Sequence, residues 1–198
     1  MGSRLRLVAG LGNPGPEYAD TRHNIGFRVV ETLAADWGVS LRMELPDLRW
    51  GRGRIAEIET VLAEPTGYMN RSGPPLRAAL EQLDINVADV VIVHDELDLD
   101  FARLKIKAKG GHGGHKGVQS VMDAFGRDDF LRVRMGIGHP PPGTSVIDHV
   151  LGRFTPEEAR HLDPFVARGR DAVQAILCKG AKESMSAFNR KFEMEEKR

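Results

Sequence analysis

Apolar and polar residues follow two different periods along this chain. Short apolar runs at residues 5–11, 90–93 and 131–137 are typical of strands buried on both faces of a sheet. At residues 24–37 and 118–125, apolar residues instead recur at the spacing of an amphipathic helix. Strands that alternate with helices predict an α/β fold, which we interpret as a single three-layer αβα sandwich around a mixed, largely parallel sheet.

Local signals refine the helix boundaries. Ser72 stands before two prolines, a pattern typical of a capped helix start, and we expect this helix to run to Leu83. Residues 155–158, Thr-Pro-Glu-Glu, predict a capping box with proline at the first helical position. Two helices should follow it, with Gly180 as a break near the end of the longer one.

We expect one domain over residues 1–190. Residues 54–63 predict one or two strands of its sheet, interrupted near Glu57. The proline-rich stretch at residues 139–143 is too short to separate domains and predicts a surface loop. The tail at residues 191–198 is dense in charge, and we expect it to fray.

Composition places the chain among ordinary globular proteins, with 198 residues, 41% hydrophobic and 28% charged. Its 28 basic and 28 acidic residues give no net charge, so any binding of anions must come from local patches. The single Cys178 cannot form an internal disulfide, which suits a reducing compartment. The N-terminus has no signal-peptide pattern and no apolar run approaches about 18 residues, so we expect a soluble, cytoplasmic protein.

The loop after the first strand concentrates residues that carry chemistry. It contains Asn13, Tyr18, His23 and Asn24 beside several glycines. Amides and an imidazole can orient water, accept a proton and stabilise an oxyanion, while glycine lets backbone approach a ligand closely. A tight turn would explain the glycines but none of the other side chains, so we expect a functional site here.

Three of these glycines, Gly10, Gly12 and Gly15, also match the dinucleotide-binding pattern G-x-G-x-x-G. That motif needs a helix that begins at the third glycine and an acid at the end of the next strand. Here Pro14 fills the loop, and the helical periodicity begins only after Thr21. A nicotinamide cofactor is therefore not expected.

An acidic stretch follows the central apolar run, beginning His94-Asp95-Glu96. The carboxyl end of a central strand is where open α/β sheets place their sites. Three interpretations remain open: a solvated acidic loop, a metal site with His112 and His115, or one buried acid that orients a histidine base. A metal is disfavoured because no pair has the helical spacing of a zinc protease.

A basic stripe extends over residues 103–116, in a segment without an acid between Phe101 and Met122. It contains Arg103, Lys105, Lys107, Lys109 and Lys116, together with His112 and His115. Strict alternation puts the lysines on one face of a strand, where they could simply prevent aggregation at a sheet edge. The glycine-rich segment and helix start that follow favour a phosphate-bearing ligand instead.

Five stretches in order resemble bacterial peptidyl-tRNA hydrolase. They are residues 10–27, 68–73, 94–99, 110–117 and 132–138, and residues 150–152 and 187–189 extend the match. The resemblance implies an enzyme that cleaves the ester between a peptide and the 3′ ribose of tRNA, so that the tRNA can be reused. The resemblance implies neither a cofactor nor a metal. It also implies that the protein is a monomer with no obligate protein partner.

The same resemblance implies roles for individual residues. His23 would be the general base that activates water, and Asp95 would hold its imidazole in the proton-accepting state. Asn13 and Asn70 would bind the peptide near the scissile carbonyl, and Asn13 would favour blocked over free aminoacyl groups. Tyr18 and Tyr68, with Met69, His115 and Lys116, would line the substrate site. Lys105, Lys107 and Arg134 would bind phosphate of the tRNA.

Two positions depart from the family pattern, since Lys116 and Lys109 stand where the family usually has asparagine and glycine. A cation at position 116 is expected to lower the pKa of a nearby His23. Two alternative functions therefore stay open: an RNA-binding protein without hydrolysis, and a metal-dependent phosphoesterase that uses His94, Asp98 and His112.

Overall fold

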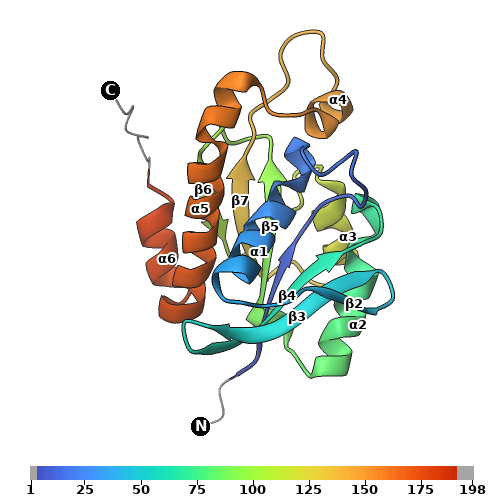
Figure 1. The fold of residues 1–198 in the computed structure, drawn as a ribbon, viewed down its shortest axis with the longest axis vertical. Coiled ribbons are helices and arrows are strands. Elements are labelled where there is room, and N and C mark those ends of the chain that lie inside the picture. The colour runs from blue at the N-terminus through green and yellow to red at the C-terminus, as the bar shows by residue number, and fades with distance from the viewer. Residues whose placement is uncertain (1–3, 191–198) are drawn as a thin grey trace.

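The computed structural model describes residues 4–190 and contains one seven-stranded sheet with helices on both faces (Figure 1). The expected αβα sandwich is confirmed. The strands run in the order β2-β3-β4-β1-β5-β7-β6. They are β1 Arg6–Gly10, β2 Arg42–Leu45, β3 Leu48–Ile55, β4 Ile58–Pro65, β5 Val90–Glu96, β6 Leu104–Lys107 and β7 Leu131–Gly136. Parallel pairing is confined to the four central strands β4-β1-β5-β7, and the pairs toward both edges are antiparallel.

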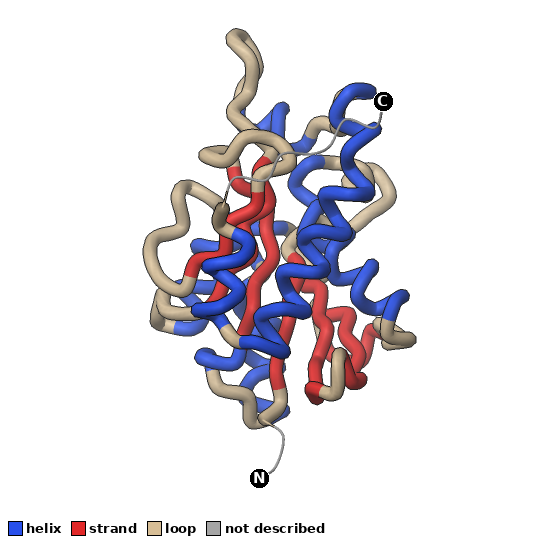
Figure 2. Tube along the Cα trace, turned by 90° about the vertical axis from the view of Figure 1, so that its left-hand side faces the viewer, coloured by secondary structure: helices blue, strands red, loops and turns tan. Residues whose placement is uncertain are grey.

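Helices cover the two faces of the sheet unequally. They are α1 Ile25–Asp36, α2 Gly73–Leu83, α3 Lys116–Phe125, α4 Val146–Leu151, α5 Pro156–Lys179 and α6 Ala181–Phe188. Helices α1, α5 and α6 pack on one face, and α2 and α3 pack on the other (Figure 2). The short α4 stands apart from both layers, beyond the end of β7 in Figure 1.

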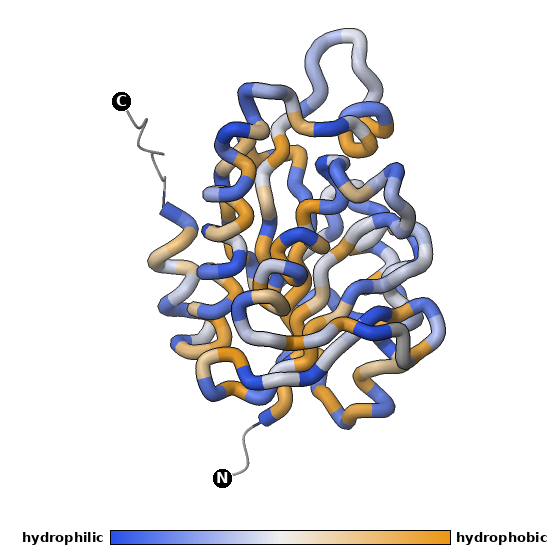
Figure 3. The backbone as a smooth tube through the Cα atoms, viewed as in Figure 1, coloured by the Kyte–Doolittle hydropathy of each residue, from blue (hydrophilic) through white to orange (hydrophobic). Residues whose placement is uncertain are grey.

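The hydrophobic core lies on both sides of the central strands, which are its most apolar segments in Figure 3. One cluster joins the sheet to α1 and α5, and a second joins it to α2 and α3. All seven residues of β5 are buried, including the polar His94-Asp95-Glu96 at its end. A strand enclosed on both faces explains the continuous apolar run in the sequence. The polar side chains follow this run, at the carboxyl end of the strand.

Most of the predicted element boundaries are confirmed. The capping box at residues 155–158 opens α5, and Gly180 separates α5 from α6. The helix predicted after Ser72 is also present, but the predicted cap is wrong. The Ser72 hydroxyl donates to the carbonyl of Met69, and the N–H of Gly73 donates to Ser120 Oγ instead.

The β-hairpin and α4 complete the comparison with the sequence. Residues 54–63 belong to two strands, β3 and β4, which meet at a turn where Ala56 and Glu57 both have positive φ. The turn thus begins before the predicted interruption. Helix α4 was not predicted at all. The frayed tail predicted at residues 191–198 lies outside the described residues, and among the residues described no helix is both long and apolar enough to cross a membrane.

Close backbone contact explains two of the glycines near the N-terminus. A side chain at Gly10 would overlap the carbonyl of Gly26, and a side chain at Gly26 would overlap the carbonyl of Val93. The start of α1 therefore lies directly on β1 and β5. Gly10 and Gly12 of the dinucleotide-like pattern thus serve the packing of β1 on α1, whereas Gly15 meets only Glu17 and has a positive φ. The 3-10 turn Arg22–Asn24 is thereby brought to the end of β5.

A single side chain covers the outer edge of β6. The Asn189 amide accepts a hydrogen bond from the N–H of Ile106 at 2.7 Å and donates one to its carbonyl at 3.0 Å. Asn189 thus occupies both backbone groups of Ile106 that a further strand would use.

Candidate active site

A cleft of about 580 Å³ opens at the carboxyl ends of β1 and β5. Its polar side is formed by Asn13, His23, Asn70, Asp95, His115 and Lys116. Its apolar side is formed by Leu97 and by Val146, Ile147, Val150 and Leu151 of α4. The loop after β1, the loop after β4, the end of β5 and the start of α3 therefore meet at one place, as expected for an open α/β sheet.

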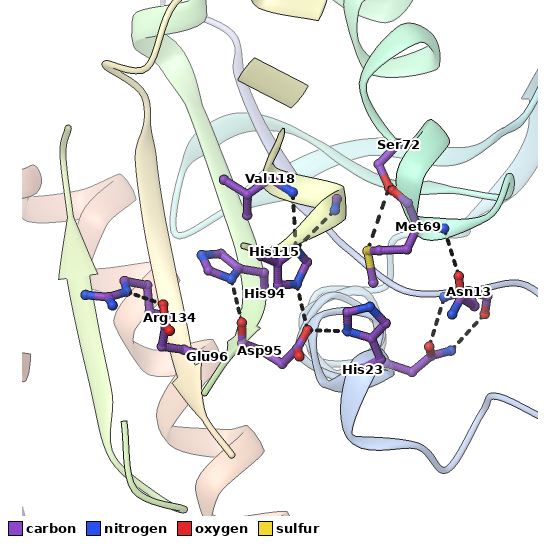
Figure 4. Close-up of polar contacts among 12 residues, drawn as sticks. Asn13, His23, Met69, Ser72, His94, Asp95, Glu96, His115, Val118 and Arg134 are labelled. Atoms are coloured by element: carbon purple, nitrogen blue, oxygen red, sulfur yellow. Dashed lines mark hydrogen bonds and ion pairs between the residues drawn. The ribbon is translucent and has the colours of Figure 1, made fainter. Parts of the chain in front are cut away.

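His23 and Asp95 form a hydrogen-bonded pair at the base of this cleft (Figure 4). His23 Nδ1 lies 2.8 Å from Asp95 Oδ1, and the Asp95 side chain is only 2% exposed. An ionised carboxylate only accepts hydrogen bonds, so Nδ1 carries the proton. Nε2 of His23 is then the ring nitrogen with a free lone pair, and it makes no hydrogen bond within residues 4–190.

His115 contacts the same carboxylate oxygen from the other side. Its Nε2 lies 2.8 Å from Asp95 Oδ1. Its Nδ1 accepts hydrogen bonds from the backbone N–H groups of Gly117 and Val118, at 3.1 and 3.2 Å, and so caps α3. Because both ring nitrogens are occupied, only the ring face of His115 remains for the substrate contact expected from the sequence.

Burial and charge set the protonation states of this pair. Burial by itself would raise the pKa of Asp95, but the charges and hydrogen bonds of His23 and His115 outweigh it and hold that pKa far below its usual range. Burial likewise would lower the pKa of His23, and Asp95 outweighs it and raises that pKa above 6.5. The net direction is therefore opposite to the lowering expected from Lys116, which is not among the causes of this shift.

Asn13 presents an amide donor to the cleft. Its Oδ1 accepts a hydrogen bond from the backbone N–H of Met69 at 2.8 Å, which fixes the orientation of the amide. Asn24, which the sequence did not single out for a role, holds the backbone of Asn13 through two hydrogen bonds of 2.9 Å. Nδ2 of Asn13 is left without a partner among the described residues, so the side chain can donate to a bound oxyanion.

The other residues expected to bind substrate differ in position. Tyr68 is 59% exposed, and with the exposed Asn70 and Lys116 it lines the cleft. The Met69 side chain is buried against Gly117, so its part in the site is mainly the backbone N–H that orients Asn13. Tyr18 lies in the loop after β1 and is not among the residues that line the cleft.

The predicted phosphate-binding residues share one face of the β6–β7 pair. Lys105 lies opposite Arg134, and Lys107 lies opposite Arg132. Arg134 Nε donates to Glu96 at 2.7 Å, which leaves the terminal nitrogens of the guanidinium without a partner among the described residues. Buried Arg132 donates to two carbonyls of the glycine-rich loop, at Gly110 and Gly111, and so anchors the stripe of lysines beside it.

Two features of the site had no clear signal in the sequence. The apolar wall comes from α4, where Val146 is 49% and Ile147 is 68% exposed. Arg22 fastens the loop that carries His23 to this region, since it donates to the carbonyl of Arg153 and to Glu158, both at 2.6 Å. The sequence offered only one hint of this second feature, the presence of an arginine within residues 21–27.

The geometry also bears on the metal alternatives. Among the described residues, His23, Asp95 and His115 are close enough to share an ion. However, His115 Nδ1 accepts two backbone hydrogen bonds, so Nε2 carries the proton and has no lone pair for a metal. The residues proposed for a phosphoesterase do not gather there: His94 is buried beneath His115, and Asp98 pairs with His139 at the surface.

Comparisons with known proteins point to one family. A family model described as peptidyl-tRNA hydrolase matches residues 7–197. The peptidyl-tRNA hydrolase of Syntrophotalea carbinolica is 47% identical over 185 residues, which cover 93% of this chain and 97% of that protein. That of Bacillus subtilis is 39% identical, with 94% and 100% covered. The crystal structure of peptidyl-tRNA hydrolase from Acinetobacter baumannii matches with a TM-score of 0.88 at 36% identity, and 96% of each chain is covered.

Proposed function

The chain belongs to the peptidyl-tRNA hydrolase family, and on this premise we propose that His23 is the general base of its reaction. An enzyme of this family hydrolyses the ester bond of peptidyl-tRNA and so releases tRNA for translation. The observation that carries the proposal is the His23–Asp95 pair, in which a buried carboxylate holds Nδ1–H and leaves Nε2 free at the cleft. A base must have such a lone pair within reach of water.

The proposed reaction begins with a water molecule between His23 Nε2 and the scissile carbonyl. Nε2 takes a proton from the water as its oxygen attacks the carbonyl carbon, and Asp95 stabilises the imidazolium that forms. The Nδ2–H group of Asn13 donates to the developing oxyanion. When the tetrahedral intermediate collapses, the C–O bond to the 3′ ribose breaks, and the imidazolium returns its proton to the ribose oxygen. The products are the free carboxylic acid of the peptide and tRNA with its 3′ hydroxyl.

The two sides of the cleft suit the two halves of this substrate. The exposed apolar side chains of α4 fit a peptide or a blocked amino acid, while Tyr68 offers a ring for stacking against the terminal base. Lys105, Lys107 and the free end of Arg134 would bind tRNA phosphates beyond the cleft. Because the substrate is produced by translation, we expect the protein to act in the cytoplasm, as a monomer.

The test is hydrolysis of an N-blocked aminoacyl-tRNA, in the presence of a chelator, by the wild type and by His23→Ala. Loss of the base should reduce kcat by about 10²–10⁴-fold and leave the binding of deacylated tRNA nearly unchanged. Asp95→Asn should also slow turnover, because it favours the wrong tautomer of His23. Near-normal turnover in His23→Ala would contradict the mechanism, and binding without hydrolysis in the wild type would favour the RNA-binding alternative.

The pH dependence follows from the raised pKa of His23. The base must be neutral, so kcat/KM should rise with pH through the pKa of His23 in the free enzyme. Since Asp95 raises that pKa, the midpoint should lie above 6.5. A midpoint near the usual carboxyl range would instead identify an acid as the base.

A further inference from the structure

Two histidines, rather than one, hold the catalytic carboxylate in place. Oδ1 of Asp95 accepts one hydrogen bond from His23 Nδ1 and one from His115 Nε2, both at 2.8 Å. The centroids of the His23 and His115 rings are 5.0 Å apart, and the ring planes are tilted by 47°. Figure 4 shows both rings beside Asp95. The proposed mechanism uses the first contact only, so the second requires an explanation.

The tautomer of His115 is fixed by the backbone of α3. Its Nδ1 accepts from the N–H groups of Gly117 and Val118, so this nitrogen cannot carry a proton while the cap is intact. The single ring proton therefore lies on Nε2, which points at Asp95. A proton on Nδ1 would set an N–H against two other N–H groups and break the cap.

The ring of His115 is also held by packing. His94, on β5, approaches it edge-on, with 4.9 Å between ring centroids and an angle of 70° between the planes. His94 is itself fixed, because its Nδ1 donates to the main-chain carbonyl of Asp95 at 2.7 Å. Three separate contacts thus give His115 one position relative to the carboxylate.

We propose that His115 is a positioning residue for the hydrolysis, which fixes the Asp95 carboxylate from the cap of α3 and thereby sets the orientation and proton affinity of His23. The proposal rests on the proposed role of His23 as base. A hydrogen bond from His115 already stabilises the negative charge of the Asp95 carboxylate, so this carboxylate attracts the proton of an imidazolium at His23 less strongly. His115 would therefore limit the rise that Asp95 causes in the pKa of His23, so that more of the base is neutral near pH 7.

Other charged groups around this cluster are either bonded to another partner or exposed to solvent. On β5, Glu96 is paired with Arg134 of β7. Arg132 of β7 is bonded to carbonyls of the glycine-rich loop, and Lys116 of α3 has an exposed side chain. All of them remain in the variants proposed below, so a change in the titration of His23 can be assigned to His115.

Two amide substitutions separate the two contacts of His115. In His115→Asn, the short side chain can still cap α3 through its oxygen, but it is too short to reach Asp95. In His115→Gln, the extra methylene lets the amide N–H group approach Asp95. The pair therefore compares a variant that keeps the cap and loses Asp95 with one that can restore the donor.

The primary measurement is the titration of the His23 ring by NMR in the free protein. His115→Asn should raise the pKa of His23 by about 0.5–1 unit and move the rising limb of kcat/KM by the same amount. The plateau kcat should fall by about tenfold as the base loses its orientation, with KM little changed. His115→Gln should return both values toward the wild type.

The result has three ways to overturn the proposal. An unchanged pKa of His23 with full plateau activity in His115→Asn would mean that His115 only caps the helix. A higher KM with the limb in place would mean that it binds substrate. Titration of wild-type His115 between pH 5 and 9 would refute the fixed tautomer, whether or not the variants fold. These titrations need no substrate, so a wild type without hydrolysis would reject the role of His23 separately.

Discussion

Lys116 is the residue at which the chain departs most clearly from the family pattern. It is the first residue of α3 and is exposed, and it lines both the cleft and a neighbouring hollow beside Asn70 and Ser120. Its ammonium makes no ion pair within residues 4–190. A cation at a helix N-terminus faces the positive end of the helix dipole, so this lysine opposes the stability of α3.

Lys116→Asn should therefore stabilise the protein by about 0.3–1 kcal/mol. The rising limb of the pH–rate profile should stay in place, because Asp95 rather than Lys116 governs the pKa of His23. Thermal unfolding and kcat/KM against pH measure the two effects, and Lys182→Ala, which removes an exposed lysine of α6, serves as the control. An upward shift of the limb would show that His23 does sense the ammonium.

At this scale the sequence supplied the residue types but not their partners. His23 and Asp95 are 72 positions apart, and only the close approach of Gly26 to β5 brings them together. The cap formed by His115 had no signal, since histidine is not a usual N-cap residue. Local motifs predict which side chains can react, whereas tertiary packing decides which of them meet.

At the scale of elements, the β3–β4 hairpin contains an ion pair that burial makes unfavourable. The Glu64 side chain is 1% exposed and accepts two hydrogen bonds from Arg49, which also contacts Glu31. Burial nevertheless exceeds the attraction of Arg49 and raises the pKa of Glu64 to about 7 from 4.5. Ionised Glu64 therefore weakens the fold near neutral pH.

The consequence is a stability that falls as pH rises. A carboxyl group with a raised pKa in the folded state stabilises it fully below pH 4.5, and this stabilisation is lost as pH rises through about 7. The loss is on the order of 3 kcal/mol. Glu64→Gln should abolish most of this decline in urea unfolding between pH 5 and 8, whereas Glu31→Gln, at the exposed partner, should retain it. An undiminished decline in Glu64→Gln would refute the assignment.

Elements were predictable where their signals were local or periodic. The capping box of α5 and the buried run of β5 depend on adjacent residues, and both were found. Helix α4 was missed because it has only six residues and turns its apolar side chains toward the cleft rather than the core. The Ser72 cap failed because its hydroxyl bonds backward to Met69 in a 3-10 turn, a local choice that sequence spacing does not reveal.

At the scale of the whole molecule, the cleft and the basic face of β6–β7 lie on separate elements, so binding of tRNA and ester cleavage should respond to different mutations. Lys107→Ala should raise KM for full-length tRNA substrates and reduce the log–log salt slope by about 0.7–0.9. A substrate that ends at the terminal adenosine should be almost unaffected. Arg134→Ala is a poorer test because it would leave Glu96 unpaired.

Lys182→Ala, on α6 across the sheet, removes the same charge and should change KM for neither substrate. Equal losses on both substrates in Lys107→Ala would instead make this lysine structural. The layered fold and the basic stripe were both predictable from alternation. Alternation alone could not show that Arg132 and Arg134 continue the stripe on the next strand, and only the family resemblance placed Arg134 with the lysines. This continuation of the stripe depends on the register of β6 against β7.

Asn189, near the C-terminal end of the described residues, has a structural role away from the cleft. Its amide imitates a neighbouring strand at Ile106, although it belongs to the turn that ends α6. A chain that stopped just before this residue would retain every side chain of the cleft. It would nevertheless lose the side chain that covers Ile106 at the edge of β6. The N–H and carbonyl of Ile106 would then be open to strand addition by another copy, so we expect the residue that ends the last helix to protect this edge of the sheet against aggregation.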